Sequence, residues 1–358
     1  MLCVRLFLRL LRGIIPWRQE YQGYIRHMAV DEEIHLMLDE LRQRFGSGVA
    51  GHEMLSRHGT FGVGGPADAW LTITHEEALA DLAALAATHN WPLMLVGNGT
   101  NILYADAGAR GIVARLHNAE WHVEDVDSAH ALLTADGGVD LPRLVNALAT
   151  RGLAGLEWGA GVPGTVGGAV VSNAGAGGAC VADTLQRARV LFTAEGVVRE
   201  LPAADVGLSY RNSRFRAERR ITFGEDGQPV VPPRAPVEPA EMITGATFLL
   251  TRDDPAAVRA RVAEHLRYRK ETQPPQKSAG SVFKNPLPQF SGKLIEEAGL
   301  KGHAIGHAQI SPRHANFIVN NGGATAADIV SLIALAQRTV RERFGVELEL
   351  EVELRGDW

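Results

Sequence analysis

Residues 155–178 read GLEWGAGVPGTVGGAVVSNAGAGG, and nine of these 24 residues are glycine. The chain as a whole has 39 glycines in 358 residues, which predicts only two or three in a stretch of this length. Glycine costs backbone entropy on folding, so this density predicts strained turns or backbone brought close to another group. Interspersed apolar residues argue against low complexity: Leu156, Trp158, Val162, Val166, Val170 and Val171.

The bulk composition is that of an ordinary globular protein, with 46% hydrophobic and 22% charged residues, over a length sufficient for two or three domains. The 36 Lys and Arg against 41 Asp and Glu give a net charge of −5, which argues against a nucleic-acid partner. Cys3 and Cys180 form neither a disulfide framework nor a metal cluster, so we expect a cytoplasmic protein without a metal. No apolar run is long enough to span a membrane, so we expect no stable membrane insertion.

The N-terminal stretch MLCVRLFLRLLRGIIPW (1–17) is apolar but is interrupted by Arg5, Arg9 and Arg12. A signal peptide needs an unbroken apolar centre and a small-residue cleavage site, and this stretch has neither. An amphipathic surface helix is one interpretation. Met28 precedes a plausible helical start, so a mis-assigned translation start is another. We expect residues 1–29 to be a dispensable tail.

Hydrophobic periodicity and capping signals predict an α+β chain. Helix starts are marked by Asp140, by Asp254 before Pro255, by Thr325 with Asp328, and by Thr74 with Glu77. Helices are expected over about 31–45, 74–89, 141–150, 255–269, 291–298 and 325–345. Strands are expected at the end of 58–73, over 92–96, in pieces up to about 250, and over the closing VELELEVEL (346–354). The proline-rich, charged segment 219–241 predicts an exposed loop, and we find no internal repeat.

The segment 159–164 formally fits the dinucleotide pattern G-x-G-x-x-G, with Asp183 at a suitable distance for a ribose ligand. That pattern belongs between a hydrophobic strand and a helix, and the further glycines Gly167 and Gly168 predict that no helix starts here. The Walker and H-E-x-x-H patterns are absent from the sequence. Two separate glycine turns remain, 97–101 and 159–168. Their successive N–H groups could hold one long anionic cofactor, such as a dinucleotide, or they could simply be two tight turns beside closely packed strands.

Seven motifs in order resemble the UDP-N-acetylenolpyruvoylglucosamine reductase (MurB) family, flavoenzymes of peptidoglycan precursor synthesis. They are TFGVGGPA (60–67), VGNGTNIL (96–103), GVPGTVGGAVVSNAGA (161–176), YRNSRF (210–215), SAGSVFKNP (278–286), HANFIVNNGGATAADI (314–329) and FGVELELEV (344–352). The resemblance covers roughly residues 45 to 355. It implies an FAD-binding domain of the vanillyl-alcohol-oxidase (PCMH) type and an α+β substrate-binding domain. The implied division is 30–254 for FAD binding, in subdomains of about 30–115 and 116–254, then 255–346 for substrate, and 347–358 for a strand carrying a catalytic glutamate.

The resemblance also implies the reaction. NADPH reduces non-covalently bound FAD, and the reduced flavin reduces the C=C of UDP-N-acetylglucosamine enolpyruvate to give UDP-N-acetylmuramate. The resulting enolate-like species needs a cation or donor at its oxygens and a proton at the adjacent carbon. Matching positions make Ser281 the proton donor, Arg211 the stabiliser of the enolate and Glu351 the support for protonation. Each has a plainer interpretation, because Ser281 fits a turn, Arg211 belongs to a basic run, and four glutamates alternate along one strand.

Binding residues are carried over in the same way. The implied flavin-lining residues are Gly97, Asn98, Gly99, Thr100, Asn101, Pro163, Gly164, Thr165, Gly167, Gly168 and Asn173. The implied substrate-binding residues are Tyr210, Lys284 and Asn285, with Arg269 and His314 as candidates that could equally be structural. A guanidinium or an ammonium group suits the diphosphate of a UDP-sugar.

The sequence departs from the family pattern in three places. Asn98 and Thr100 replace a glycine and a serine of the first turn, and we expect the turn to survive because Asn tolerates positive φ. Gly177 replaces a tyrosine, and the insertion 219–241 has no tyrosine that could close over substrate. Two rival functions stay open: an oxidase of the same flavin superfamily that uses oxygen, and a UDP-sugar-binding protein that has lost its flavin.

Overall fold

The computed structural model describes residues 19–216, 221–224, 229–231 and 237–358, in two compact units, Met1–Ala50 and Gly51–Trp358. The first unit contains helix α2 (Gln19–Phe45), which begins well before the expected start near Asp31. Residues 24–45 contain neither glycine nor proline, so nothing in the sequence ends the helix there. The expected tail boundary after residue 29 therefore lies inside α2, and residues 1–18 lie outside the described part of the chain.

The first sheet of the second unit has the order β1-β2-β5-β3-β15. Its strands are β1 (Ala50–Met54), β2 (Pro66–Ile73), β5 (Ala109–Leu116), β3 (Leu93–Val96) and β15 (Val237–Glu238). The pairs β2–β5, β3–β5 and β15–β3 are parallel. Residues 67–71 of β2 are all buried, as is usual for a strand of a parallel sheet covered on both faces.

Helix α3 (Glu76–His89) follows β2, but the expected capping box at Thr74 does not form. The N-cap position is His75, and no side chain caps the helix. Because the helix starts one residue later than the pattern suggested, the Thr74 hydroxyl lies outside the position from which a cap can reach the first turn.

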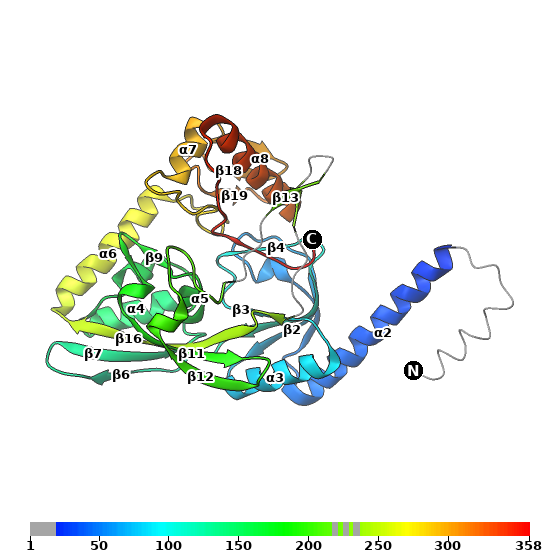
Figure 1. Cartoon of the computed structure of the whole chain (residues 1–358), viewed down its shortest axis with the longest axis horizontal. Helices are drawn as coiled ribbons and strands as arrows, with labels where there is room; N and C mark the ends of the chain where they lie inside the picture. The colour runs from blue at the N-terminus through cyan, green and yellow to red at the C-terminus, as the bar shows by residue number, and fades with distance from the viewer. Residues whose placement is uncertain (1–18, 217–220, 225–228, 232–236) are drawn as a thin grey trace. The chain divides into compact units, whose positions relative to one another are not determined.

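The second sheet is antiparallel, with the order β12-β11-β16-β7-β6. Its strands are β12 (Val197–Pro202), β11 (Leu185–Phe192), β16 (Glu241–Arg252), β7 (His130–Asp136) and β6 (Trp121–Asp125). The short β8 (Leu153–Ala154) also pairs with β16. Helices α4 (Leu141–Thr150), α5 (Val166–Val171) and α6 (Pro255–Thr272) gather beside this sheet (Figure 1). Asp140 caps α4 and Asp254 caps α6, as predicted.

Helix α6 belongs to the core of this second sheet. Val258 and Val262 are buried there together with Trp158 and Phe248. The sequence placed a domain boundary at residue 255, at the start of this helix. Its buried side chains, Val258 and Val262, pack with the core that precedes this boundary in the sequence.

The C-terminal region surrounds a separate hydrophobic cluster. It contains α7 (Ser291–Glu297), α8 (Ala326–Phe344) and a small sheet of β17 (Ala304–Ile305), β18 (Ala308–Ile310) and β19 (Ile318–Asn320). Thr325 and Asp328 form the predicted capping box of α8, and Gly345 ends the helix at a φ of 67°.

The closing residues form a much shorter strand than their alternation predicts. Only β20 (Glu353–Arg355) is a strand, and it pairs in parallel with β4 (Ile102–Tyr104) of the N-terminal half. The preceding residues bond a different partner: Lys284 donates its N–H to the Glu349 carbonyl at 2.9 Å, and Glu351 donates to Val282 at 2.8 Å. The change of partner interrupts the strand, because one ladder cannot follow two separate segments.

The segment 219–241 is not wholly an exposed loop. A hairpin of β13 (Thr222–Phe223) and β14 (Pro229–Val230) lies within it, and β15 joins the first sheet. The flanking Ile221 and Val231 are buried in the C-terminal cluster. Residues 217–220, 225–228 and 232–236 lie outside the described part of the chain.

We expect Thr325→Ala to lower the free energy of unfolding by about 1 kcal/mol, because the Asp328 N–H loses its acceptor at the start of α8. Ser331→Ala is the matched control, since its hydroxyl donates only to the Ala327 carbonyl within the same helix. Urea unfolding compares the two variants. An equal effect of both substitutions would contradict the capping role.

Candidate functional site

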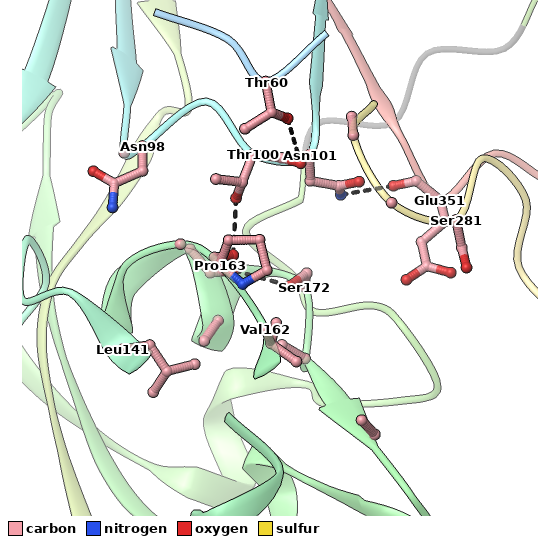
Figure 2. Close-up of a pocket in the computed structure, with 18 of the residues that line it drawn as sticks. Thr60, Asn98, Thr100, Asn101, Leu141, Val162, Pro163, Ser172, Ser281 and Glu351 are labelled. Atoms are coloured by element: carbon pink, nitrogen blue, oxygen red, sulfur yellow. Dashed lines mark hydrogen bonds between the residues drawn. The ribbon is translucent and has the colours of Figure 1, made fainter. Parts of the chain in front are cut away.

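One pocket of about 1100 Å³ lies within the second unit, and both glycine turns line it. Further walls come from residues 174–177, from one face of α6 and from residues 273–281. Figure 2 shows Asn98, Thr100 and Asn101 on one side, and Val162, Pro163 and Ser172 on another. Such a volume lies at or above the upper end of typical ligand pockets, so it suits a dinucleotide together with a second ligand.

The two glycine turns touch each other through groups close to the backbone. The Thr100 hydroxyl donates to the Pro163 carbonyl at 3.0 Å. A Cβ on Gly97 would lie 2.7 Å from Thr165 Oγ1, and one on Gly164 would lie 3.1 Å from Thr100 Oγ1. Glycine at these two positions leaves room for the close approach of one turn to the other.

Contrary to the prediction, a helix does begin among the glycines. The Thr165 side chain accepts from the Gly168 N–H at 3.2 Å and caps α5. The N–H groups of Val166 and Gly167 donate to the carbonyls of Val139 and Gly137 at 2.9 and 2.8 Å. This long-range support of the first turn offsets the poor helix propensity of glycine.

The first turn presents backbone donors to the pocket. Across the described residues, the N–H groups of Asn98, Gly99 and Thr100 have no protein acceptor, and all three residues line the pocket. Gly99 has a φ of 63°, and a Cβ there would lie 1.9 Å from the His58 carbonyl oxygen. A concave run of N–H groups without a side chain in the way fits the anionic oxygens of a dinucleotide.

Asn98 stabilises this turn through side-chain hydrogen bonds that the sequence did not predict. It is not among the residues with positive φ, so its tolerance of that region is not used. Its side-chain amide instead donates to the Asp140 carboxylate at 3.3 Å and accepts from Arg115 at 2.7 Å. The departure from glycine therefore adds a side-chain brace between β5 and the start of α4.

Arg211 lies on the pocket wall and pairs with Glu351, its Nε 3.1 Å from Oε1. Its Nη1 and Nη2 donate to the carbonyls of Asn173 and Gly175 at 3.3 and 2.5 Å. The side chain is only 19% exposed, so the expected alternative of a solvated basic run is wrong for this residue. The backbone of Arg211 has a φ of 52°, a costly conformation for a residue other than glycine.

The four alternating glutamates divide into two kinds. Glu347 and Glu349 face water, with side chains 71% and 68% exposed, whereas those of Glu351 and Glu353 are 20% and 10% exposed. Burial raises the pKa of the Glu351 carboxyl, and the charges of Arg211, Arg216 and Lys284 oppose that rise only in part. Glu351 can therefore hold a proton at a higher pH than an ordinary glutamate.

Ser281 lines the pocket beside Gly280, which has a φ of 79°. Its neighbour Val282 donates to the Asn316 carbonyl at 2.8 Å and accepts from the Glu351 N–H. These bonds hold the serine segment against the glutamate segment, and Figure 2 shows Ser281 and Glu351 at the same end of the pocket.

Three of the five expected substrate-binding residues line the pocket: Tyr210, Arg269 and Asn285. The Tyr210 hydroxyl accepts from the Asn285 N–H at 3.4 Å, and burial lowers the pKa of Arg269. Lys284 is absent from the lining among the described residues, and its Nζ lies 3.7 Å from a Glu349 carboxylate oxygen. His314 is also absent from the lining among the described residues, and its Nδ1 accepts from the Asn316 N–H at 3.2 Å.

Asn173, expected to bind the cofactor, is likewise absent from the lining among the described residues. Its side chain is buried, donating to the Ser209 carbonyl at 2.8 Å and accepting from the Ala182 N–H at 3.0 Å. Through its bond to Ser209, the Asn173 side chain stabilises the turn that contains Arg211.

Apart from Arg269, the sequence did not predict one wall of the pocket, the α6 face that also carries Arg261, His265 and Tyr268. Their spacing of three to four residues on a predicted helix was a usable signal. It also missed Arg355, which lines the pocket and pairs with Glu353 at 2.6 Å and Glu238 at 3.2 Å. Among the described residues we find no cluster of side chains suited to a metal ion and no helix long and apolar enough to cross a membrane.

Comparisons with known proteins find two matching families and similar reductases. The family described as "FAD binding domain" matches residues 67–202, and the family "UDP-N-acetylenolpyruvoylglucosamine reductase, C-terminal domain" matches residues 273–355. The reductase of that name from Bacillus velezensis is 38% identical over 89% of this chain and 98% of its own length. The one from Chloroflexus aggregans is 42% identical over 85% of this chain and 96% of its own length. The crystal structure of the reductase from Thermus caldophilus covers 84% of this chain and 97% of its own, with 34% identity and a TM-score of 0.66.

The raised pKa of Glu351 predicts a pH-dependent effect of Glu351→Gln. The folded protein retains a proton that the unfolded chain releases, so this contribution to stability is complete below the ordinary value of 4.5 and is lost as the pH rises through the folded pKa. Glutamine does not titrate, so the variant should gain in Tm relative to the unchanged protein as the pH rises above 4.5. Exposed Glu347→Gln is the control. A Tm difference for Glu351→Gln that does not change with pH would count against the raised pKa.

Proposed function

This chain belongs to the UDP-N-acetylenolpyruvoylglucosamine reductase family, and we propose that three of its side chains complete the family's reaction. Ser281, Arg211 and Glu351 together deliver a proton to the enolpyruvyl carbon adjacent to the one that accepts the hydride. The reaction reduces UDP-N-acetylglucosamine enolpyruvate to UDP-N-acetylmuramate for peptidoglycan synthesis. FAD, when bound, supplies the hydride, which it receives from NADPH. The observation that carries the proposal is the Arg211–Glu351 pair on the wall of the pocket that both glycine turns also line.

The two turns are the groups that would hold FAD. Residues 97–101 offer N–H donors for its phosphate oxygens, and residues 163–168 supply a second backbone surface held against the first. We propose that FAD is held non-covalently by such hydrogen bonds and close backbone contacts. The core shared by α6 and the second sheet supports a division in which FAD binding extends through α6 and the substrate-binding part begins near residue 273.

Arg211 is the cation that stabilises negative charge on the enolate and its carboxylate. Its guanidinium lies in a partly buried wall, where such a charge acts more strongly than in water. Ser281 is the proton donor, and a serine hydroxyl is a weak acid, so it needs a partner that adjusts its proton affinity or relays its proton. Glu351, with its raised pKa and its place at the same end of the pocket, is suited to that support.

Tyr210, Asn285 and Arg269 are the side chains that we assign to the UDP-sugar, with Arg269 directed to the diphosphate. We place the enzyme in the cytoplasm, where NADPH and nucleotide sugars are available. Membership of the reductase family disfavours the oxygen-dependent oxidase. The alternative of a flavin-free binding protein is disfavoured by the fit of the glycine turns to a dinucleotide and by the presence of all three catalytic side chains.

Ser281→Ala tests the assignment of the proton donor because the two half-reactions share the flavin but not the proton. The variant should bind FAD and be reduced by NADPH at nearly the unchanged rate. Reoxidation by the enolpyruvyl UDP-sugar should slow by ~10²–10⁴, the usual contribution of a positioned general acid. Ser281→Cys should retain part of the activity, since a thiol can also deliver a proton. Stopped-flow absorbance of the flavin, without oxygen, measures each half-reaction.

Ser331→Ala, the same substitution on α8 and outside the described pocket lining, is the matched control and should leave both half-reactions unchanged. If Ser281 is only a turn residue, alanine will cost about 1 kcal/mol of stability or less and alter neither rate. Equal slowing of both halves would remove the support for Ser281 as the donor, since it would indicate a general disturbance of the site.

A further inference from the structure

Arg216 lies behind the pocket wall, and its side chain is only 2% exposed. Its Nη1 donates to the carbonyl of Arg211 at 2.5 Å. Its Nη2 donates to the carbonyl of Glu351 and, at 3.4 Å, to that of Leu350. One buried guanidinium thus joins the backbones of the two residues that form the ion pair of the pocket wall.

The charge of Arg216 is compensated within the same buried region. Its Nε lies 3.9 Å from a carboxylate oxygen of Glu353, which also pairs with Arg355 at 2.6 Å. Arg355 pairs in addition with Glu238 at 3.2 Å, and Arg211 pairs with Glu351. Three arginines therefore alternate with three glutamates, so a buried cation is tolerated at this position.

The two segments that Arg216 joins also meet through the side chains of the Arg211–Glu351 ion pair, whereas Arg216 links their backbones. They are far apart in the sequence, and Arg211 has a backbone φ of 52°, which persists only where surrounding contacts enforce it. The bond from Arg216 to the Arg211 carbonyl closes the turn from within, and the bond to Glu351 ties that turn to the C-terminal segment. A planar guanidinium can direct donors to both carbonyls at once, whereas a lysine ammonium is a single point of charge.

We propose that Arg216 is a positioning residue that sets the register of Arg211 against Glu351 and so controls proton delivery in the second half-reaction. The proposal rests on the roles given above to Arg211 and Glu351. Arg216 itself is absent from the described pocket lining, so it acts through those two residues and not by contact with substrate. Movement of a reacting group by about 1 Å can cost on the order of a hundredfold in rate.

Arg216→Lys keeps the charge and removes the bridge. In FAD-loaded full-length protein we expect flavin reduction by NADPH to stay within about threefold of the unchanged rate, since that step does not need the proton donor. Reoxidation by the enolpyruvyl UDP-sugar should slow by about 10- to 100-fold. Arg214→Lys is the matched control, because Arg214 lies two residues away and makes its forked contact with Glu241 near the surface. It should change neither rate.

A double substitution separates positioning from stability. If Arg216 acts through Glu351, then Arg216→Lys should have little further effect on reoxidation when Glu351→Gln is already present. Full additivity of the two effects, or equal slowing of both half-reactions, would overturn the proposal. Failure of both Arg216→Lys and Arg216→Met to fold would also overturn it, by assigning Arg216 to fold stability. If reduced flavin in the unchanged protein is not reoxidised by the UDP-sugar, the proposed function itself fails instead.

Discussion

The hydrogen bond from the Thr100 hydroxyl to the Pro163 carbonyl joins the two glycine turns, and the pocket depends on that junction. One turn follows a parallel strand of the first sheet, and the other precedes the short helix against the antiparallel sheet. A Cβ at Gly97 would collide with Thr165 across the junction, and a Cβ at Gly99 would collide with the His58 carbonyl. Glycine costs backbone entropy at these positions, but it allows the turns to approach each other and still leave their N–H groups available.

The end of the pocket at Arg211 and Glu351 is built from charged side chains, and it adjoins the first glycine turn through the bond from Asn101 to the Glu351 carbonyl. Arg211 and Glu351 face the cavity, and Arg216, Glu353 and Arg355 lie beside or behind them. Removing one member of such an array leaves an uncompensated buried charge. Loss of a single charged side chain should therefore destabilise the folded protein. The arrangement also explains why the C-terminal strand is short. Residues 349–351 bond the serine segment, and residues 353–355 bond β4, so the glutamate is held between both halves of the site.

Local signals in the sequence predicted local structure well wherever the deciding contacts were also local. The caps at Asp140, Asp254 and Thr325 formed as expected because each bond lies within four residues. The predicted cap at Thr74 does not form because α3 begins one residue later than expected. The helix at Val166 was not predicted, because the neighbouring glycines disfavour a helix. Its first N–H groups find acceptors near residue 138, and these contacts are not visible in the local sequence.

The sequence alone determined the family resemblance, the two glycine turns and the residue types available for redox and proton chemistry. Tertiary structure alone decided which of those residues meet. It separated Glu351 from Glu347 and Glu349 by burial, although all three share one alternating pattern. In the folded chain Lys284, His314 and Asn173 are absent from the described pocket lining, whereas one face of α6 contributes to it. The physical reason is that burial, ion pairing and pKa depend on contacts between distant segments, whereas periodicity and spacing report only on residues that are close along the chain.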